Sequence, residues 1–176
     1  MMKRFFVSLI AILCCVCAIF TFAACDGNND TDNGGKNSNG SNNSSIFYIK
    51  YGSTKIELGM DAAAPLAALG EAKSVKELGD CAGLGSQVKY TYDNFDIYTL
   101  KNDEGETIDE ISFTSDIAVT PKGICLGSTA DEVTQAYGTP STQTEKAIIY
   151  TKGNNSLKFG IKNGEVSSIA YIRAAN

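Results

Sequence analysis

The sequence predicts an α+β fold of two tandem repeats, each a short helix or helical pair followed by an antiparallel meander of three or four strands. Two segments, Leu58–Ala72 and Leu126–Pro140, share an apolar residue, a Gly and a short amphipathic run that closes with an apolar residue and Gly. Each is followed by alternating segments separated by turn residues, a pattern typical of hairpins. The two sets also end alike, in IDEISF at 108–113 and VSSIAY at 166–171. We therefore expect one repeat over residues 46–117 and a second over 118–176.

The N-terminal residues have the pattern of an export signal. Lys3 and Arg4 precede an apolar run that closes with two alanines, which is the pattern of a secretory signal peptide. Residues Phe22–Cys25 resemble the lipobox of bacterial lipoproteins, and the resemblance implies removal of residues 1–24 and acylation of Cys25, palmitate included. The alternative is an uncleaved anchor, since about 18 apolar residues approach the length that spans a membrane. Both place the remaining chain outside the cytoplasm, and the lipoprotein reading places it on the extracytoplasmic face of the cell membrane.

Residues 25–45 are expected to be a lipidated cysteine and a flexible tether. No apolar side chain occurs between Asp26 and Ser45, so this stretch cannot bury enough surface to offset the entropy of ordering it. Its aspartates lack the sixth-position Gly and twelfth-position Glu of a calcium loop in one register. The segment therefore predicts a tether and no calcium site.

The first repeat begins with two short strands. Residues 46–51 are β-branched and aromatic, Gly52-Ser53 turns the chain, and residues 54–58 alternate. A helix follows, which Asp61 can cap and Gly70 ends, and Pro65 indicates that it is either short or begins at Pro65 itself. Residues 73–86 predict a loop with one helical turn at 75–78. Alternation then predicts three strands joined by tight turns, at 87–92, 95–100 and 108–114.

The second repeat has tighter connections. Thr129 and Glu132 fit a capping box at the start of a helix, and Gly138 with Pro140 ends it. Val133, Ala136 and Tyr137 form its apolar stripe. Three strands are then expected, at 147–152, 157–161 and 166–172.

These patterns resemble three groups of proteins. The tandem arrangement is similar to the β-lactamase-inhibitory-protein-like (BLIP-like) fold, and the Leu58-Gly59-Met60 and Leu126-Gly127-Ser128 segments resemble the SmpA/OmlA lipoproteins. The region from Cys81 to Thr99 also resembles uncharacterised lipoproteins of Gram-positive bacteria. The inhibitor resemblance implies a concave, aromatic sheet surface that grips a protein partner. Tyr98 and Tyr171 are the candidate partner-binding residues, because they lie in strands with apolar residues on both faces.

Cysteine and histidine usage limits the chemistry. Apart from Cys25, the exported part holds Cys81 and Cys125, which predict either one disulfide or two separate thiols. The chain has no His, which excludes catalytic triads and His-ligated metals. The paired carboxylates lie in turns and strands, where charges commonly protect sheets from wrong pairing. We expect no enzyme, no cofactor and no metal.

The net charge and the lack of catalytic motifs together predict a binding protein. Beyond Cys25 the chain has 13 basic and 20 acidic residues, a net charge of −7. This charge disfavours nucleic acid, which selects basic surfaces. The expected function is that of a membrane-anchored, non-catalytic module that binds an extracytoplasmic protein or peptide through its sheet face. The alternatives are a structural or assembly lipoprotein of the envelope and a receptor for a small ligand or cell-wall glycan.

Overall fold

A computed structural model describes residues 46–80 and 83–174. The signal sequence, Cys25, the tether and Cys81 lie outside the described residues, so the expectations about them stay predictions. The fold-class prediction is wrong. The described chain is mostly β, with 51% strand, 12% helix and two helices, and it forms one eight-stranded antiparallel sheet plus a two-stranded sheet in place of two helix-plus-meander repeats.

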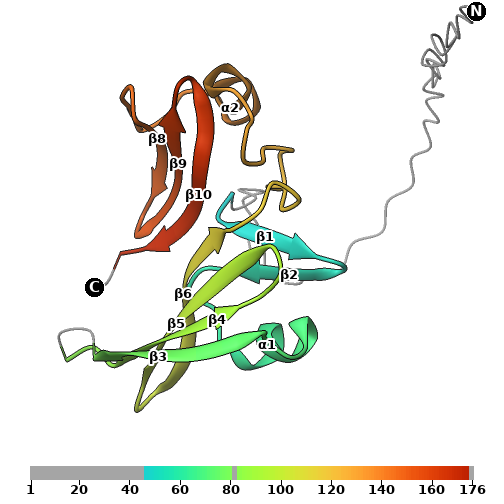
Figure 1. The fold of residues 1–176 in the computed structure, drawn as a ribbon. Helices are drawn as coiled ribbons and strands as arrows, with labels where there is room; N and C mark the ends of the chain where they lie inside the picture. The colour runs from blue at the N-terminus through green and yellow to red at the C-terminus, as the bar shows by residue number, and fades with distance from the viewer. Residues whose placement is uncertain (1–45, 81–82, 175–176) are drawn as a thin grey trace, which may run out of the picture. The chain divides into compact units, whose positions relative to one another are not determined.

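The large sheet has the strand order β3-β4-β5-β6-β10-β9-β8-β7. Figure 1 shows β3 to β6 in green to yellow and β8 to β10 in orange to red, and the β6–β10 pair joins these two groups into one sheet. That pair matches Tyr171 with Ile111 and Ile172 with Glu110. The strands are β3 (Ser74–Asp80), β4 (Ser86–Thr91), β5 (Phe95–Asn102), β6 (Gly105–Phe113), β7 (Thr142–Gln143), β8 (Ala147–Lys152), β9 (Asn155–Lys162) and β10 (Glu165–Arg173).

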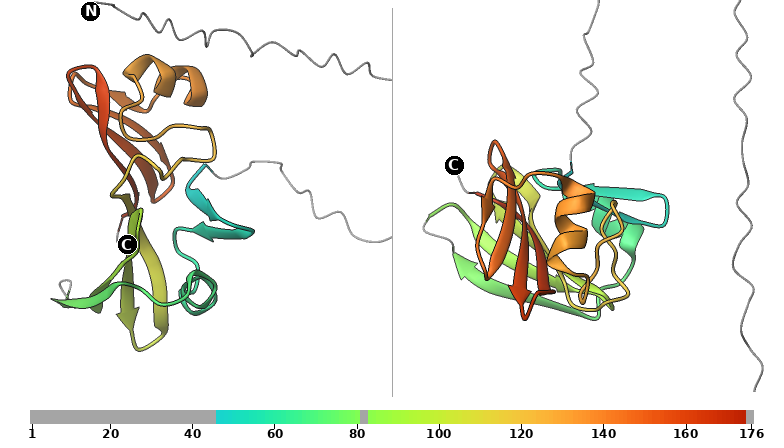
Figure 2. Two further views of the ribbon diagram at one scale, coloured as in Figure 1. Left: turned by 45° about the vertical axis from the view of Figure 1, so that its right-hand side comes forward. Right: turned by 90° about the horizontal axis from the view of Figure 1, so that it is seen from above.

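One face of the large sheet is covered by the remaining elements, which are β1 (Tyr48–Tyr51), β2 (Thr54–Glu57), α1 (Ala63–Leu69) and α2 (Ala130–Tyr137). Figure 2 shows the β1–β2 hairpin and α2 on the same side of the sheet.

The two helices differ in how their N-termini are capped. The predicted capping box of α2 is confirmed, whereas α1 has no side-chain cap at Ala62, and Asp61 Oδ1 accepts only from the Ala63 N–H at 3.0 Å.

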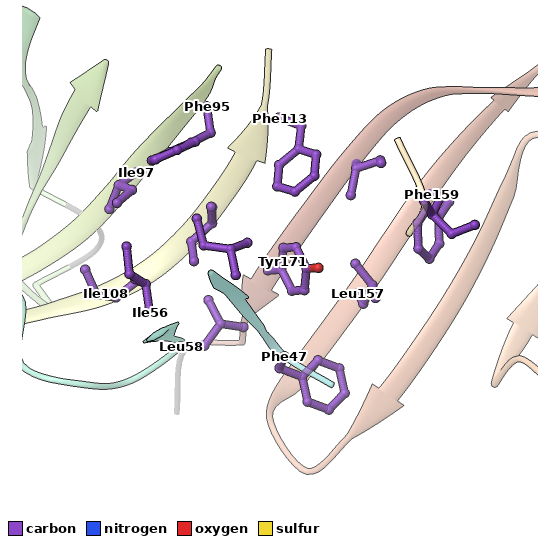
Figure 3. Close-up of a cluster of buried hydrophobic side chains, with 14 of the residues drawn as sticks. Phe47, Ile56, Leu58, Phe95, Ile97, Ile108, Phe113, Leu157, Phe159 and Tyr171 are labelled. Carbon is purple, nitrogen blue, oxygen red and sulfur yellow. The ribbon is translucent and has the colours of Figure 1, made fainter. Parts of the chain in front are cut away.

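A single hydrophobic core lies between the sheet and these covering elements (Figure 3). The β1–β2 hairpin and the residues directly before and after it contribute Phe47, Ile49, Ile56 and Leu58, and α2 contributes Val133. The sheet contributes residues from both sides of position 117/118, Phe113 and Phe159 among them. The boundary between the two expected repeats at 117/118 stays a prediction, but side chains from both sides of it pack into one core.

The two Gly-containing segments that suggested repeats dock on the sheet through equivalent backbone bonds. Gly59 N–H donates to Ile108 O at 2.7 Å, and Gly127 N–H donates to Val166 O at 2.8 Å. Both glycines have positive φ, at +81° and +88°, which an L side chain adopts only under strain. The sequence correspondence therefore reflects two similar local attachments to one continuous sheet.

The prediction for the residues of β3 is also wrong. Residues 74–80 were predicted to lie in a loop with a helical turn, yet they pair with β4 from Ser74↔Thr91 to Asp80↔Ser86. All seven residues of β3 are exposed, so the strand buries no apolar face and shows no periodicity. The strand forms because its backbone pairs with the open edge of β4, and the sequence of residues 74–80 alone does not reveal that edge.

Candidate functional site

The predicted contact residue Tyr98 lies on the face of the large sheet opposite the core. Phe95 and Ile97 of β5 are buried in the core, and alternation sends Tyr98 and Leu100 to the other face. Tyr98 is half-buried, and Lys89 Nζ lies 5.4 Å from its ring centroid. The residue is therefore accessible, but on a surface richer in charge than in aromatic rings.

A polar group surrounds Tyr98 on this face. Lys89 Nζ lies 2.8 Å from Asp96 Oδ2, and this hydrogen bond is the main reason that the pKa of Lys89 is raised. Asp96 is only 6% exposed, and its Oδ1 has no hydrogen-bond partner among the described residues. On the next strand, Ser112 Oγ donates to Glu110 Oε1 at 2.5 Å. The cross-strand pairs Asp96↔Ser112 and Tyr98↔Glu110 hold these side chains together.

Tyr171 does not belong to this surface, so its prediction as an exposed contact residue is wrong. It is 0% exposed, and its ring packs against Phe113 with the ring centroids 6.1 Å apart. Burial strongly raises the pKa of its hydroxyl. Figure 3 shows Tyr171 within the core beside Phe113 and Leu157. Tyr171 points inward because β10 places its alternate residues Ile169 and Tyr171 on the core face.

Most of the other aromatic residues in the large sheet also lie in the core. Buried among them are Phe95, Phe113, Tyr150 and Phe159. Tyr150 O–H donates to Gly138 O at 2.9 Å, which links β8 to the end of α2. The concave aromatic surface that the family resemblance implied is not seen in the described part of the chain.

An apolar groove lies elsewhere, beside the β1–β2 hairpin. Three large side chains at its rim are exposed: Tyr51 at 48%, Ile117 at 73% and Val119 at 51%. The groove has a volume of about 270 Å³, and Phe95 and Phe113 line it together with Lys50 and Asn94. Among the described residues that line it, Lys50 is the only charged one. We call this set of rim and lining residues the apolar groove.

A second cavity opens where β5 and β10 end and β6 begins. It has a volume of about 410 Å³, and its lining comprises Leu84, Leu100, Asn102, Glu104, Thr107, Asp109, Arg173 and Ala174. Asp109 is the extra residue of a β-bulge, because β5 pairs Tyr98 with Glu110 and Thr99 with Ile108. We call this cavity the charged pocket.

Sequence reasoning missed both cavities. Ile117 and Val119 lie in a connection without periodicity, and an apolar residue in a loop gives no sign of whether a core covers it. Asp109 and Arg173 are 64 positions apart in the sequence and meet only because β10 follows β6 in the sheet. The bulge that releases Asp109 from regular pairing also leaves no clear mark in the sequence.

The predicted cysteine pair stays a prediction. Cys125 is half-buried, and its Sγ lies 3.7 Å from Ser128 Oγ. Cys81 lies outside the described residues.

The described residues show neither a metal-ligand cluster nor a membrane-spanning helix. No cluster of three or more potential His, Cys, Asp or Glu ligands occurs in residues 46–80 and 83–174. Within the same ranges, neither helix is long and apolar enough to cross a membrane. Comparison with protein-family models, with curated proteins and with solved structures finds no match to the chain.

Proposed function

We propose that this chain is an extracytoplasmic lipoprotein that acts as a non-catalytic protein-binding module through the apolar groove. The observation that carries the proposal is the grouping of Tyr51, Ile117 and Val119 around one groove. Single exposed apolar residues are ordinary on protein surfaces. A group of them around a cavity is typical of interaction sites, because its burial by a partner removes apolar surface from water.

The groove favours a peptide segment with an apolar side chain next to a carboxylate. Phe95 and Phe113 provide an apolar floor, and burying a leucine-sized side chain there contributes about 1.5–3 kcal/mol. Lys50 lies at the same groove with its side chain exposed, so it can pair with an acidic neighbour of that side chain. This preference is a matter of charge complementarity and supplies specificity more than affinity.

The position of the groove in the sequence suits a tethered module. Ile49, Lys50 and Tyr51 line it and lie only a few residues beyond the tether expected over residues 25–45. A flexible tether of this length has a root-mean-square span of about 25 Å. Partners anchored in or near the same membrane would therefore meet the groove at high effective concentration.

Selection of peptides from a display library against the intact chain tests the proposal. Enriched peptides are expected to share an apolar residue beside Asp or Glu, and Ile117→Ser with Val119→Ser should abolish their binding. Lys50→Met should keep the apolar preference and remove the acidic one. Val75→Ser is the matched control, since Val75 is 58% exposed on β3, away from the groove.

Two results of that selection would count against the groove. If the double serine variant binds the enriched peptides as well as the wild type, the groove is not the contact surface. If Tyr98→Ala abolishes binding while the double serine variant retains it, the partner instead contacts the open sheet face. That face is the second candidate, and the observation that favours it is the half-buried Tyr98 beside Lys89.

A further inference from the structure

The charged pocket combines features that the proposed protein-binding function does not use. Its volume of about 410 Å³ lies within the range of small-molecule sites. Leu84 and Leu100 provide apolar walls, and Asn102 and Thr107 provide neutral hydrogen-bonding groups. Charges of both signs line the same cavity, with the Asp109 carboxylate and the Arg173 guanidinium both half-buried.

The two charges are close enough to interact but do not satisfy one another. Arg173 lowers the pKa of Asp109, while burial, the larger effect, raises it. The ion pairs within 4.0 Å among the described residues join Lys55 to Glu57, Lys73 to Asp93 and Lys89 to Asp96. Neither Asp109 nor Arg173 takes part in these, and neither side chain has a hydrogen bond to another described residue. A half-buried guanidinium and carboxylate that face one cavity without pairing are available to a ligand.

The fold holds Arg173 in this position. A Cβ added at Gly59 would lie 3.3 Å from Arg173 Nε and 3.4 Å from its Cζ, so the guanidinium lies directly against the Gly59 backbone. Gly59 is in turn fixed to β6, where its N–H donates to Ile108 O and the Ile108 N–H donates to Met60 O. Ile108 immediately precedes Asp109. The same short stretch of β6 therefore positions both charged groups.

We propose that the charged pocket binds a free, apolar α-amino acid. The ligand carboxylate pairs with Arg173, its ammonium group pairs with Asp109, and its side chain contacts Leu84 and Leu100. Glu104 also lines the pocket and adds a second acidic group to it. This binding site is independent of the apolar groove and does not require a protein partner.

The charge pattern selects a zwitterion over simpler ions. An anion such as phosphate would gain one guanidinium and face two carboxylates, which repel it. A cation would pair with Asp109 and leave Arg173 as a half-buried charge without a partner. Only a ligand with both charges satisfies both groups, and the leucine walls then favour an apolar side chain.

Titration of L-leucine into the intact chain, followed by calorimetry or by NMR shifts of pocket residues, tests this inference. Saturable binding at or below the millimolar range is expected, because a ligand of so few atoms has limited affinity. N-acetyl-L-leucine lacks the ammonium charge and L-leucinamide lacks the carboxylate. Each should bind about tenfold to a hundredfold more weakly, since each loses one charge-assisted contact.

Substitutions assign the two contacts separately. Arg173→Met keeps most of the apolar stem and should abolish leucine binding, whereas Arg173→Lys should retain part of it. Asp109→Asn should weaken binding of leucine but have little effect on the residual binding of N-acetyl-L-leucine. Lys152→Met and Asp116→Asn are matched controls, because both residues are exposed and lie outside the pocket lining.

Two outcomes would overturn the proposal. One is the absence of saturable leucine binding up to about 10 mM, well above the affinity expected for this ligand size. The other is leucine binding that Arg173→Met leaves unchanged in a variant whose circular dichroism and thermal unfolding match the wild type. Neither outcome affects the peptide selection, which depends on different residues, so the two proposals fail separately.

Discussion

The replacement of Tyr171 by Phe isolates the energetic role of one buried hydroxyl. Tyr171 is 0% exposed, and its hydroxyl, like that of Tyr137, has no hydrogen-bond partner among the described residues. The two hydroxyls nevertheless lie near enough that Tyr137 contributes to raising the pKa of Tyr171. A buried polar group without a partner costs about 1–3 kcal/mol. Tyr171→Phe removes that group and keeps the ring, so we expect the free energy of unfolding to rise by up to about 1–2 kcal/mol.

Tyr171→Ala is the contrasting variant. It removes a ring that packs against Phe113, and loss of a buried aromatic side chain costs about 3–5 kcal/mol. Urea unfolding followed by far-ultraviolet circular dichroism measures both variants without relying on tyrosine fluorescence, which the substitutions alter. A loss of about 1 kcal/mol or more in Tyr171→Phe would refute the reasoning, since it would mean that the hydroxyls of Tyr171 and Tyr137 share a stabilising hydrogen bond.

Three further predictions follow from local geometry. Thr129→Ala should lower the free energy of unfolding by about 1 kcal/mol in urea titrations, because it removes the capping box with Glu132, whereas Thr142→Ala on the short edge strand β7 should be nearly neutral. Gly85→Ala should cost about 1–3 kcal/mol, since φ is +127° and the new Cβ would lie 2.3 Å from Lys101 O; an unchanged urea midpoint would show that this turn relaxes freely. Alkaline solutions should destabilise the fold: burial raises the pKa of Tyr90 to about 12 and also that of Tyr171, so the unfolded chain loses these protons at lower pH than the folded chain. The free energy of unfolding is therefore unaffected by them below the ordinary tyrosine pKa near 10 and falls as the pH rises from there toward the folded-state values. Urea midpoints at about pH 8 and pH 11 should differ less in Tyr171→Phe than in the wild type.

The sequence by itself determined the features that depend on a few neighbouring residues. The capping box of Thr129 and Glu132, the end of α2 at Gly138 and the range of β8 are found where the pattern predicts them. Strands β4, β5, β6, β9 and β10 also lie within a few residues of the expected alternating segments. Caps, turns and alternation depend on hydrogen bonds and side-chain periodicity within a short window, so a short window suffices to predict them.

Only the tertiary structure decided how these pieces combine. The β6–β10 pair turns the predicted meanders into one sheet, and the edge of β4 makes a strand of residues 74–80. The same assembly buries Tyr171 and leaves Tyr98 half-buried on the opposite face, although both lie in strands with apolar residues on both faces. It also brings Asp109 and Arg173 to one pocket and leaves Ile117 exposed beside a groove. Which face of a strand is buried, and which distant charges meet, depends on what packs against each strand, and no local window of sequence contains that partner.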